Sequence, residues 1–296
     1  MELALVFEGG GGKGAYEVGA WKALRDLNLE NSFKSVIGTS VGALNALLFG
    51  QQRIDMAERI WREISPGKIL SAHGGEKRSM ASQEGLRILL DVNITGTLQK
   101  QVYVCCSHIT RTTISDDRFS LWGDSGKDCG LFSDRGFLGV HIDETITPEY
   151  IKLNGLRKEK QIQYLLASSA LPAVYESVFI DGREYRDGGI LKEHNLPFMK
   201  AFELGYRKAL AISLEEGVSG LRTIDGNQVY ILRPSVSLGD LMGGTLDFDA
   251  QNAMWRMECG YRDLMEHKDE IIRFIGSISN SLRMPGYIRD RFKRMV

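Results

Sequence analysis

The chain has 296 residues, enough for one large α/β domain or two small ones. With 43% hydrophobic and 25% charged residues, it has the ordinary composition of a soluble globular enzyme. The net charge of −1 gives no reason to expect nucleic acid as a partner, because surfaces that bind nucleic acid are usually strongly basic.

The lack of a recognisable targeting signal and the pattern of cysteines indicate a reduced, cytoplasmic compartment. No apolar stretch approaches the roughly 20 residues needed to span a bilayer, and the N-terminus has neither a basic region nor a cleavage site. The four cysteines suggest neither a disulfide framework nor a metal site. Cys105 and Cys106 are adjacent in an apolar run, where a strand would turn their side chains to opposite faces as core thiols.

The first fifty residues predict a strand, a helix, a second strand and a second helix. Residues 3–7 are an apolar run bounded by glycines, as expected of a strand covered on both faces. A helical period follows from Gly14 to Leu27, then a short strand at 34–38 and an almost wholly apolar helix at 41–49. A crossover of this size makes the two strands parallel, so their C-terminal ends lie on the same edge of the sheet.

The later segments continue one α/β domain. We predict strands at residues 101–107, 208–214 and 228–233, and helices at 157–168 and 196–205. The segment 247–275 predicts one or two amphipathic helices. With no internal repeat and no Pro/Ser-rich linker, we predict a single domain over 1–296, in which 216–296 completes or flanks the part that carries the motifs.

A glycine-rich loop lies between the first strand and the first helix. It consists of Gly9, Gly10, Gly11, Gly12, Lys13 and Gly14. The spacing satisfies G-x-G-x-x-G, so a dinucleotide-binding enzyme of the Rossmann type is the alternative interpretation. That interpretation wants an acidic residue at the end of the second strand, which instead reads Gly-Thr-Ser. A P-loop would need Ser or Thr after the lysine. What remains is a loop of unobstructed N–H groups at a helix N-terminus, suited to an anion such as a transient oxyanion.

The second motif supplies a nucleophile. Gly38, Thr39, Ser40, Val41 and Gly42 form G-x-S-x-G at a strand-to-helix junction, which is the context of a nucleophile elbow. The flanking glycines allow a turn sharp enough to expose the hydroxyl. Because the two strands are parallel, we expect Ser40 to lie beside the glycine loop.

The third motif is Asp187-Gly188-Gly189. A carboxylate followed by two glycines places Asp187 on a loop whose backbone can approach another group closely. Taken alone, Asp-Gly is more often a plain turn.

Together these motifs resemble the patatin-like phospholipase family, which has a G-G-G-x-[K/R]-G loop, a G-x-S-x-G elbow and a D-G-[G/A] box in this order. The segments 167–172 and 195–197 also resemble the family's A-S-x-A-x-P and N-x-P elements, and the resemblance covers about residues 3–215. It implies a three-layer α/β/α fold with a central, mostly parallel sheet and metal-free, cofactor-free hydrolysis of lipid acyl esters, phospholipids included. Carried over, Ser40 is the nucleophile, Asp187 the base, and Gly10, Gly11 and Gly12 are the oxyanion donors.

Three features of the sequence, namely His194 and the segments 115–139 and 283–294, each allow two interpretations. The link between Ile190 and Asn195 is longer than is usual in the family, so His194 is either a loop hydrogen-bonding residue, which we favour, or a catalytic one. No pair of histidines has H-x-x-x-H spacing, which disfavours a zinc site. Residues 115–139 form either a cap over the acyl pocket or a small satellite core. The basic segment 283–294 is either a solvated terminal helix, which we favour, or a tail in transient contact with a membrane surface.

Overall fold

The computed structural model describes residues 2–70, 81–110, 132–133, 136–137, 146–172 and 174–276. The segment 115–139, expected to be either a cap or a satellite core, falls largely outside these residues, and the basic segment 283–294 falls wholly outside them. Among the described residues, no helix has the length and apolarity that crossing a membrane requires.

A nine-stranded sheet forms the centre of the molecule, in the order β10-β11-β9-β1-β2-β3-β8-β7, with β6 also paired to β3. The parallel strands in its middle are β1 (Leu3–Phe7), β2 (Phe33–Thr39), β3 (Gln101–Ile109), β9 (Lys208–Ile212) and β11 (Asn227–Leu232). The antiparallel strands are β6 (Ile146–Lys152), β7 (Val178–Ile180), β8 (Arg183–Asp187) and β10 (Gly220–Ile224). A separate pair consists of β4 (Phe132–Ser133) and β5 (Gly136–Phe137).

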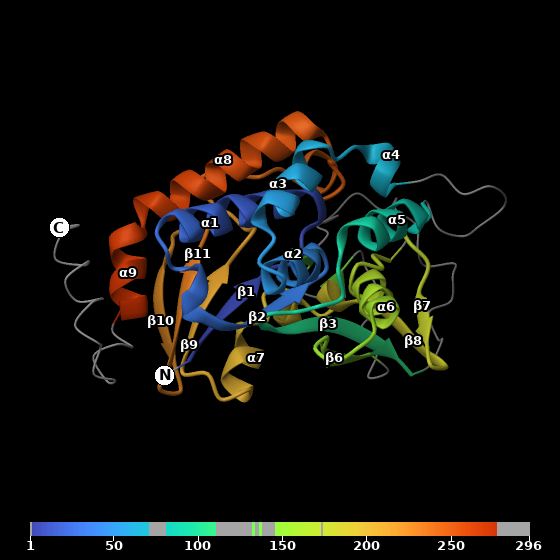
Figure 1. Cartoon of the computed structure of the whole chain (residues 1–296), viewed down its shortest axis with the longest axis horizontal. Coiled ribbons are helices and arrows are strands. Elements are labelled where there is room, and N and C mark those ends of the chain that lie inside the picture. Colours follow the sequence, from blue (N-terminus) through green and yellow to red (C-terminus); the bar gives the residue numbers. More distant parts are fainter. Residues whose placement is uncertain are drawn as a thin grey trace.

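Helices cover both faces of the sheet (Figure 1). One side carries α1 (Ala15–Asp26), α2 (Val41–Gly50), α3 (Ile54–Arg62) and α8 (Ala250–Glu266), and the opposite side carries α7 (Phe198–Glu203). The remaining helices are α4 (Pro66–Ile69), α5 (Glu84–Asn93), α6 (Lys158–Ser168) and α9 (Lys268–Gly276). The mixed, mostly parallel sheet between helical layers confirms the predicted three-layer α/β/α fold.

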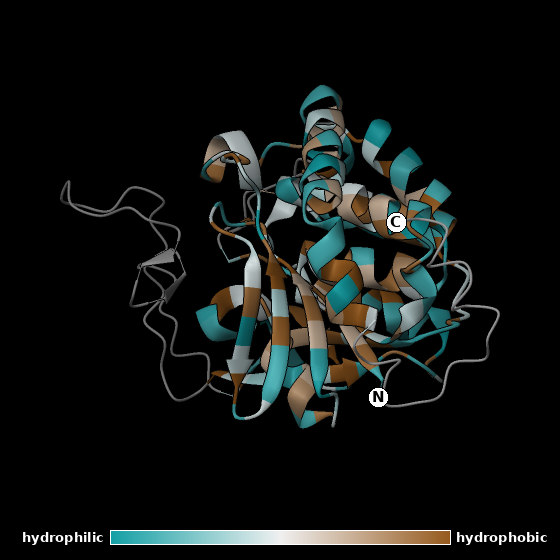
Figure 2. Cartoon of the chain, turned by 90° about the vertical axis from the view of Figure 1, so that its left-hand side faces the viewer, coloured by the Kyte–Doolittle hydropathy of each residue, from teal (hydrophilic) through white to brown (hydrophobic). Residues whose placement is uncertain are grey.

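Alternation along the buried strands explains the two layers. In β1, Leu3, Leu5 and Phe7 pack into the core beneath α1 and α2, whereas Ala4 and Val6 pack into the core beneath α7. All five side chains are fully buried, as predicted for a strand covered on both faces. Hydrophobic residues gather where strands and helices meet, and hydrophilic residues lie on the outer turns of the helices (Figure 2).

The predicted elements are confirmed with small differences at their ends. The helix predicted from Gly14 begins at Ala15 after a 3-10 turn, η1 (Gly11–Gly14), and the helix predicted at 196–205 spans only 198–203. The segment 247–275 forms two helices, α8 and α9. Cys105 and Cys106 are both buried in β3, as predicted for core thiols.

Candidate active site

Ser40 lies at a sharp turn between β2 and α2. Its φ of 53° is uncommon for a residue other than glycine and turns the side chain out of the strand–helix path. A Cβ on Gly38 would lie 2.2 Å from the carbonyl oxygen of Gly42, and a Cβ on Gly42 would lie 2.6 Å from the carbonyl oxygen of Glu8. Both positions of the G-x-S-x-G motif therefore need glycine for close backbone packing.

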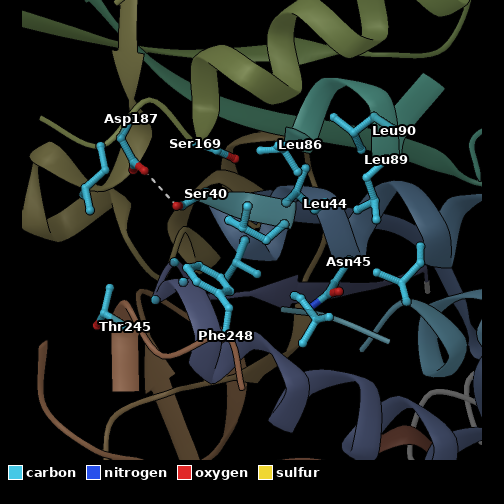
Figure 3. A pocket seen from close by; sticks show the side chains of 18 of the residues that line it. Ser40, Leu44, Asn45, Leu86, Leu89, Leu90, Ser169, Asp187, Thr245 and Phe248 are labelled. Carbon is cyan, nitrogen blue, oxygen red and sulfur yellow. Dashed lines mark hydrogen bonds between the residues drawn. The ribbon is translucent and has the colours of Figure 1, made fainter. Parts of the chain in front are cut away.

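Asp187 lies directly opposite the hydroxyl of Ser40. The Oγ of Ser40 donates a hydrogen bond of 2.7 Å to Oδ2 of Asp187, and the N–H of Gly189 donates one of 2.8 Å to Oδ1 (Figure 3). Asp187 was expected on a loop, but it is the last residue of β8, so a strand holds its backbone. Here Gly188 packs against the carbonyl of Cys105 and Gly189 against the side chain of Asn195.

The carboxyl group of Asp187 is almost fully buried, with 3% of the residue exposed. Burial raises its pKa from 3.8 to about 7, although the hydrogen bonds from Ser40 and Gly189 act in the opposite direction. A carboxylate with such a pKa is a much better proton acceptor near neutral pH than an exposed aspartate.

The glycine loop lies beside Ser40, as predicted from the adjacent parallel strands β1 and β2. Of its residues, Gly9, Gly10 and Gly11 line the same pocket as Ser40 and Asp187, whereas Gly12, Lys13 and Gly14 are absent from this lining. The N–H of Gly9 donates to the carbonyl of Asn195 at 3.1 Å. Gly10 and Gly11 are therefore candidate oxyanion donors that line the pocket, whereas Gly12, also predicted as a donor, is not among the lining residues.

Two buried polar residues support this loop: Glu8, which no motif includes, and Asn195, which begins the N-x-P element at 195–197. Glu8 accepts hydrogen bonds from the Ser213 hydroxyl at 2.7 Å, the Leu214 N–H at 2.5 Å and the Asn195 amide at 3.3 Å. Asn195 Nδ2 also donates to the carbonyl of Gly9 at 3.0 Å. Burial raises the pKa of Glu8 to about 6. The position of Glu8 between the first strand and the glycine loop was the only sequence signal for its role. Its partners are known only from the fold.

A serine next to the nucleophile fixes the elbow. The backbone N–H of Ser40 donates to Oγ of Ser168 at 2.9 Å, and Ser168 donates in turn to the carbonyl of Cys105 at 2.6 Å. Ser168 belongs to the segment 167–172 that resembles the family's A-S-x-A-x-P element, which is the sequence signal for it.

The ring of His194 is engaged away from the nucleophile. Its Nδ1 lies 2.8 Å from the hydroxyl of Tyr150, and its backbone carbonyl accepts a hydrogen bond of 2.7 Å from Thr39. Burial lowers the pKa of the imidazole. His194 also does not belong to the lining of the pocket that contains Ser40. The contacts thus favour the hydrogen-bonding interpretation. No group of three potential metal ligands occurs among the described residues.

An apolar pocket extends from the Ser40–Asp187 pair between the helices. Figure 3 shows Ser40 and Asp187 at one end of it, Leu44 and Leu86 in the middle, and Leu89 and Leu90 toward the other end. Additional lining residues come from α3 and the turn that follows it, and from the segment after β11, namely Ile60, Trp61, Ile64, Thr245, Leu246 and Phe248. Such a lining suits a long hydrocarbon group whose polar end reaches Ser40.

Two comparisons with known proteins give a match. A family model described as patatin-like phospholipase matches residues 5–202. Among solved structures, the crystal structure of VipD from Legionella pneumophila aligns over 91% of this chain and 67% of its own chain, at 12% sequence identity and a TM-score of 0.45. None of the curated proteins matches the chain.

Proposed function

The chain belongs to the patatin-like phospholipase family, and on that premise we propose that it is a serine-dependent lipid acyl hydrolase that acts through Ser40 and Asp187. The observation that carries the proposal is the hydrogen bond of 2.7 Å from Oγ of Ser40 to Oδ2 of Asp187 at the end of an apolar pocket. A hydroxyl is a weak nucleophile unless a base accepts its proton, and this carboxylate is in direct contact with it.

The reaction begins with proton transfer from Ser40 to Asp187. As the proton moves, Oγ attacks the ester carbonyl carbon, and the carbonyl oxygen becomes an oxyanion that faces the N–H groups of Gly10 and Gly11. The tetrahedral species collapses when the C–O bond to the alcohol breaks, and Asp187 returns its proton to the leaving alcohol. A water molecule then attacks the acyl-serine carbonyl as one of its protons passes to Asp187. The second tetrahedral species collapses when the bond to Oγ breaks, Asp187 returns the proton to Oγ, and the fatty acid is released.

The substrate we propose is an acyl ester of a phospholipid or lysophospholipid. The pocket places apolar side chains of α2, α3 and α5 next to the nucleophile, so the acyl chain is the part of a lipid that it fits. The head group then remains on the solvent side, and the enzyme meets its substrate by transient contact with a lipid surface.

Release of fatty acid from phospholipid vesicles tests this proposal. We expect the wild-type protein to release fatty acid, and Ser40→Ala and Asp187→Asn to fall to the background rate while still folded. Ser32→Ala is the matched control, because Ser32 is exposed and lies in a separate 3-10 turn. A Ser40→Ala protein that retains activity would refute the assignment of the nucleophile.

A further inference from the structure

Helix α8 lies outside the segment matched by the family model, yet one of its side chains reaches the glycine loop. Arg256 is only 1% exposed. A guanidinium has five N–H donors, and here each has an acceptor. Nε donates to the Leu238 carbonyl at 3.2 Å, Nη1 to the carbonyls of Gly12 at 3.3 Å and Asp247 at 3.1 Å, and Nη2 to the Gly243 carbonyl and to Oδ2 of Asp247, both at 2.7 Å.

Three of the four carbonyls that Arg256 binds belong to two segments in direct contact. One is the glycine loop, and the other is residues 243–248, which also supply the pocket wall through Thr245 and Phe248. A Cβ on Gly11 would lie 2.0 Å from the carbonyl oxygen of Thr245, and one on Gly12 would lie 1.9 Å from that of Asp247. With so little space between the segments, movement of one must displace the other.

Attachment of α8 to the fold has a separate basis. The helix packs closely along α1, where a Cβ on Gly19 would lie 1.8 Å from the carbonyl oxygen of Met257 and one on Gly260 would lie 2.0 Å from that of Tyr16. Burying a charged guanidinium is costly unless all its donors are used. Arg256 is therefore more than an anchor for α8, and its specific effect falls on the loop and on the adjoining pocket wall.

We propose that Arg256 is a positioning residue for ester hydrolysis, which holds the glycine loop against residues 243–248 so that the N–H groups of Gly10 and Gly11 face the reacting carbonyl. The inference rests on the proposed function. It adds that the segment after residue 202, beyond the family match, is needed to complete the oxyanion site. Lysine cannot replace the residue, because an ammonium has three donors and no planar fork.

Steady-state hydrolysis of p-nitrophenyl butyrate by Arg256→Lys and Arg262→Lys tests the proposal. Arg262 is the matched control, because it lies on the same helix with half of its side chain exposed, 51%. We expect Arg256→Lys to lower kcat about a hundredfold, the scale of misplaced catalytic groups, with little change in KM, since the acyl pocket remains. Arg262→Lys should match the wild type. A folded Arg256→Lys protein with the wild-type kcat would overturn the proposal.

Hydrogen exchange gives a readout that does not depend on activity. Amides of residues 10–14 should exchange faster in Arg256→Lys than in the wild type or in Arg262→Lys, and unchanged exchange in a folded Arg256→Lys protein would overturn the proposal. If the wild type hydrolyses no ester, the proposed function fails, and exchange still decides whether Arg256 holds the loop. If Arg256→Lys does not fold, Asp247→Asn replaces it, because Asp247 is the charged partner of the guanidinium and its loss loosens the link between Arg256 and residues 243–248. We then expect a lower kcat and faster exchange at residues 10–14, and wild-type values of both would overturn the proposal.

Discussion

Replacing Asp187 with asparagine should make the protein more stable while it removes activity. Burial raises the pKa of Asp187 from 3.8 to about 7. Below the lower value the carboxyl is protonated in both folded and unfolded protein, and between the two values only the folded protein keeps the proton. The free energy of unfolding therefore falls by about 4 kcal/mol in all as pH rises through this window. Above about pH 7 it levels off.

Asparagine has the same shape, carries no charge and can keep both contacts, accepting from Gly189 and donating to Ser40. We expect Asp187→Asn to gain stability relative to the wild type as pH rises, by about 1.4 kcal/mol per pH unit between pH 4 and 7. Urea denaturation of both proteins at several pH values measures this difference. Glu8, the other buried carboxyl near the loop, titrates in both proteins and cancels. A stability difference that is constant from pH 4.5 to 8 would refute the reasoning.

Three further predictions concern activity on a soluble ester. The kcat/KM should rise with pH through about 7, because only ionised Asp187 can accept the proton of Ser40, and a flat profile between pH 5 and 9 would contradict this role. Gly11→Ala should lower kcat about a hundredfold or more, the scale of losing one oxyanion donor, because its φ of 55° and the nearby Thr245 carbonyl exclude a side chain; near-normal turnover would make the loop merely structural. His194→Ala should keep most of its activity because the ring contacts Tyr150, whereas an inactive, folded variant would indicate a triad.

The fold could be predicted largely because its central strands are local and strongly patterned. The run Leu3–Phe7 and the apolar helix Val41–Gly50 can bury their hydrophobic side chains only inside an α/β core. The pairing of strands that are far apart in the sequence could not be predicted in the same way. Nothing in residues 183–187 indicates that they pair antiparallel with β3, yet this pairing places Asp187 beside Ser40.

The glycine and serine motifs predicted where the site lies, since they depend on local backbone geometry. Two side chains that support the site, Glu8 and Arg256, escaped prediction, because their partners are remote in the sequence. Glu8 binds Ser213 and Leu214, and Arg256 binds Gly12. The role of a buried charged residue can be assigned only when the fold shows which groups it contacts. For the same reason, the sequence did not distinguish Gly12, which Arg256 contacts, from Gly10 and Gly11, which line the pocket.

The central claim, that Ser40 is the nucleophile and Asp187 its base, is tested most directly by labelling with a fluorophosphonate and identifying the modified peptide. The reagent reacts with a serine whose hydroxyl is activated by a neighbouring base. We expect one adduct, on Ser40, in the wild-type protein and a much slower reaction in Asp187→Asn. An adduct on a different serine, or equally rapid labelling of Ser40 in Asp187→Asn, would contradict the claim.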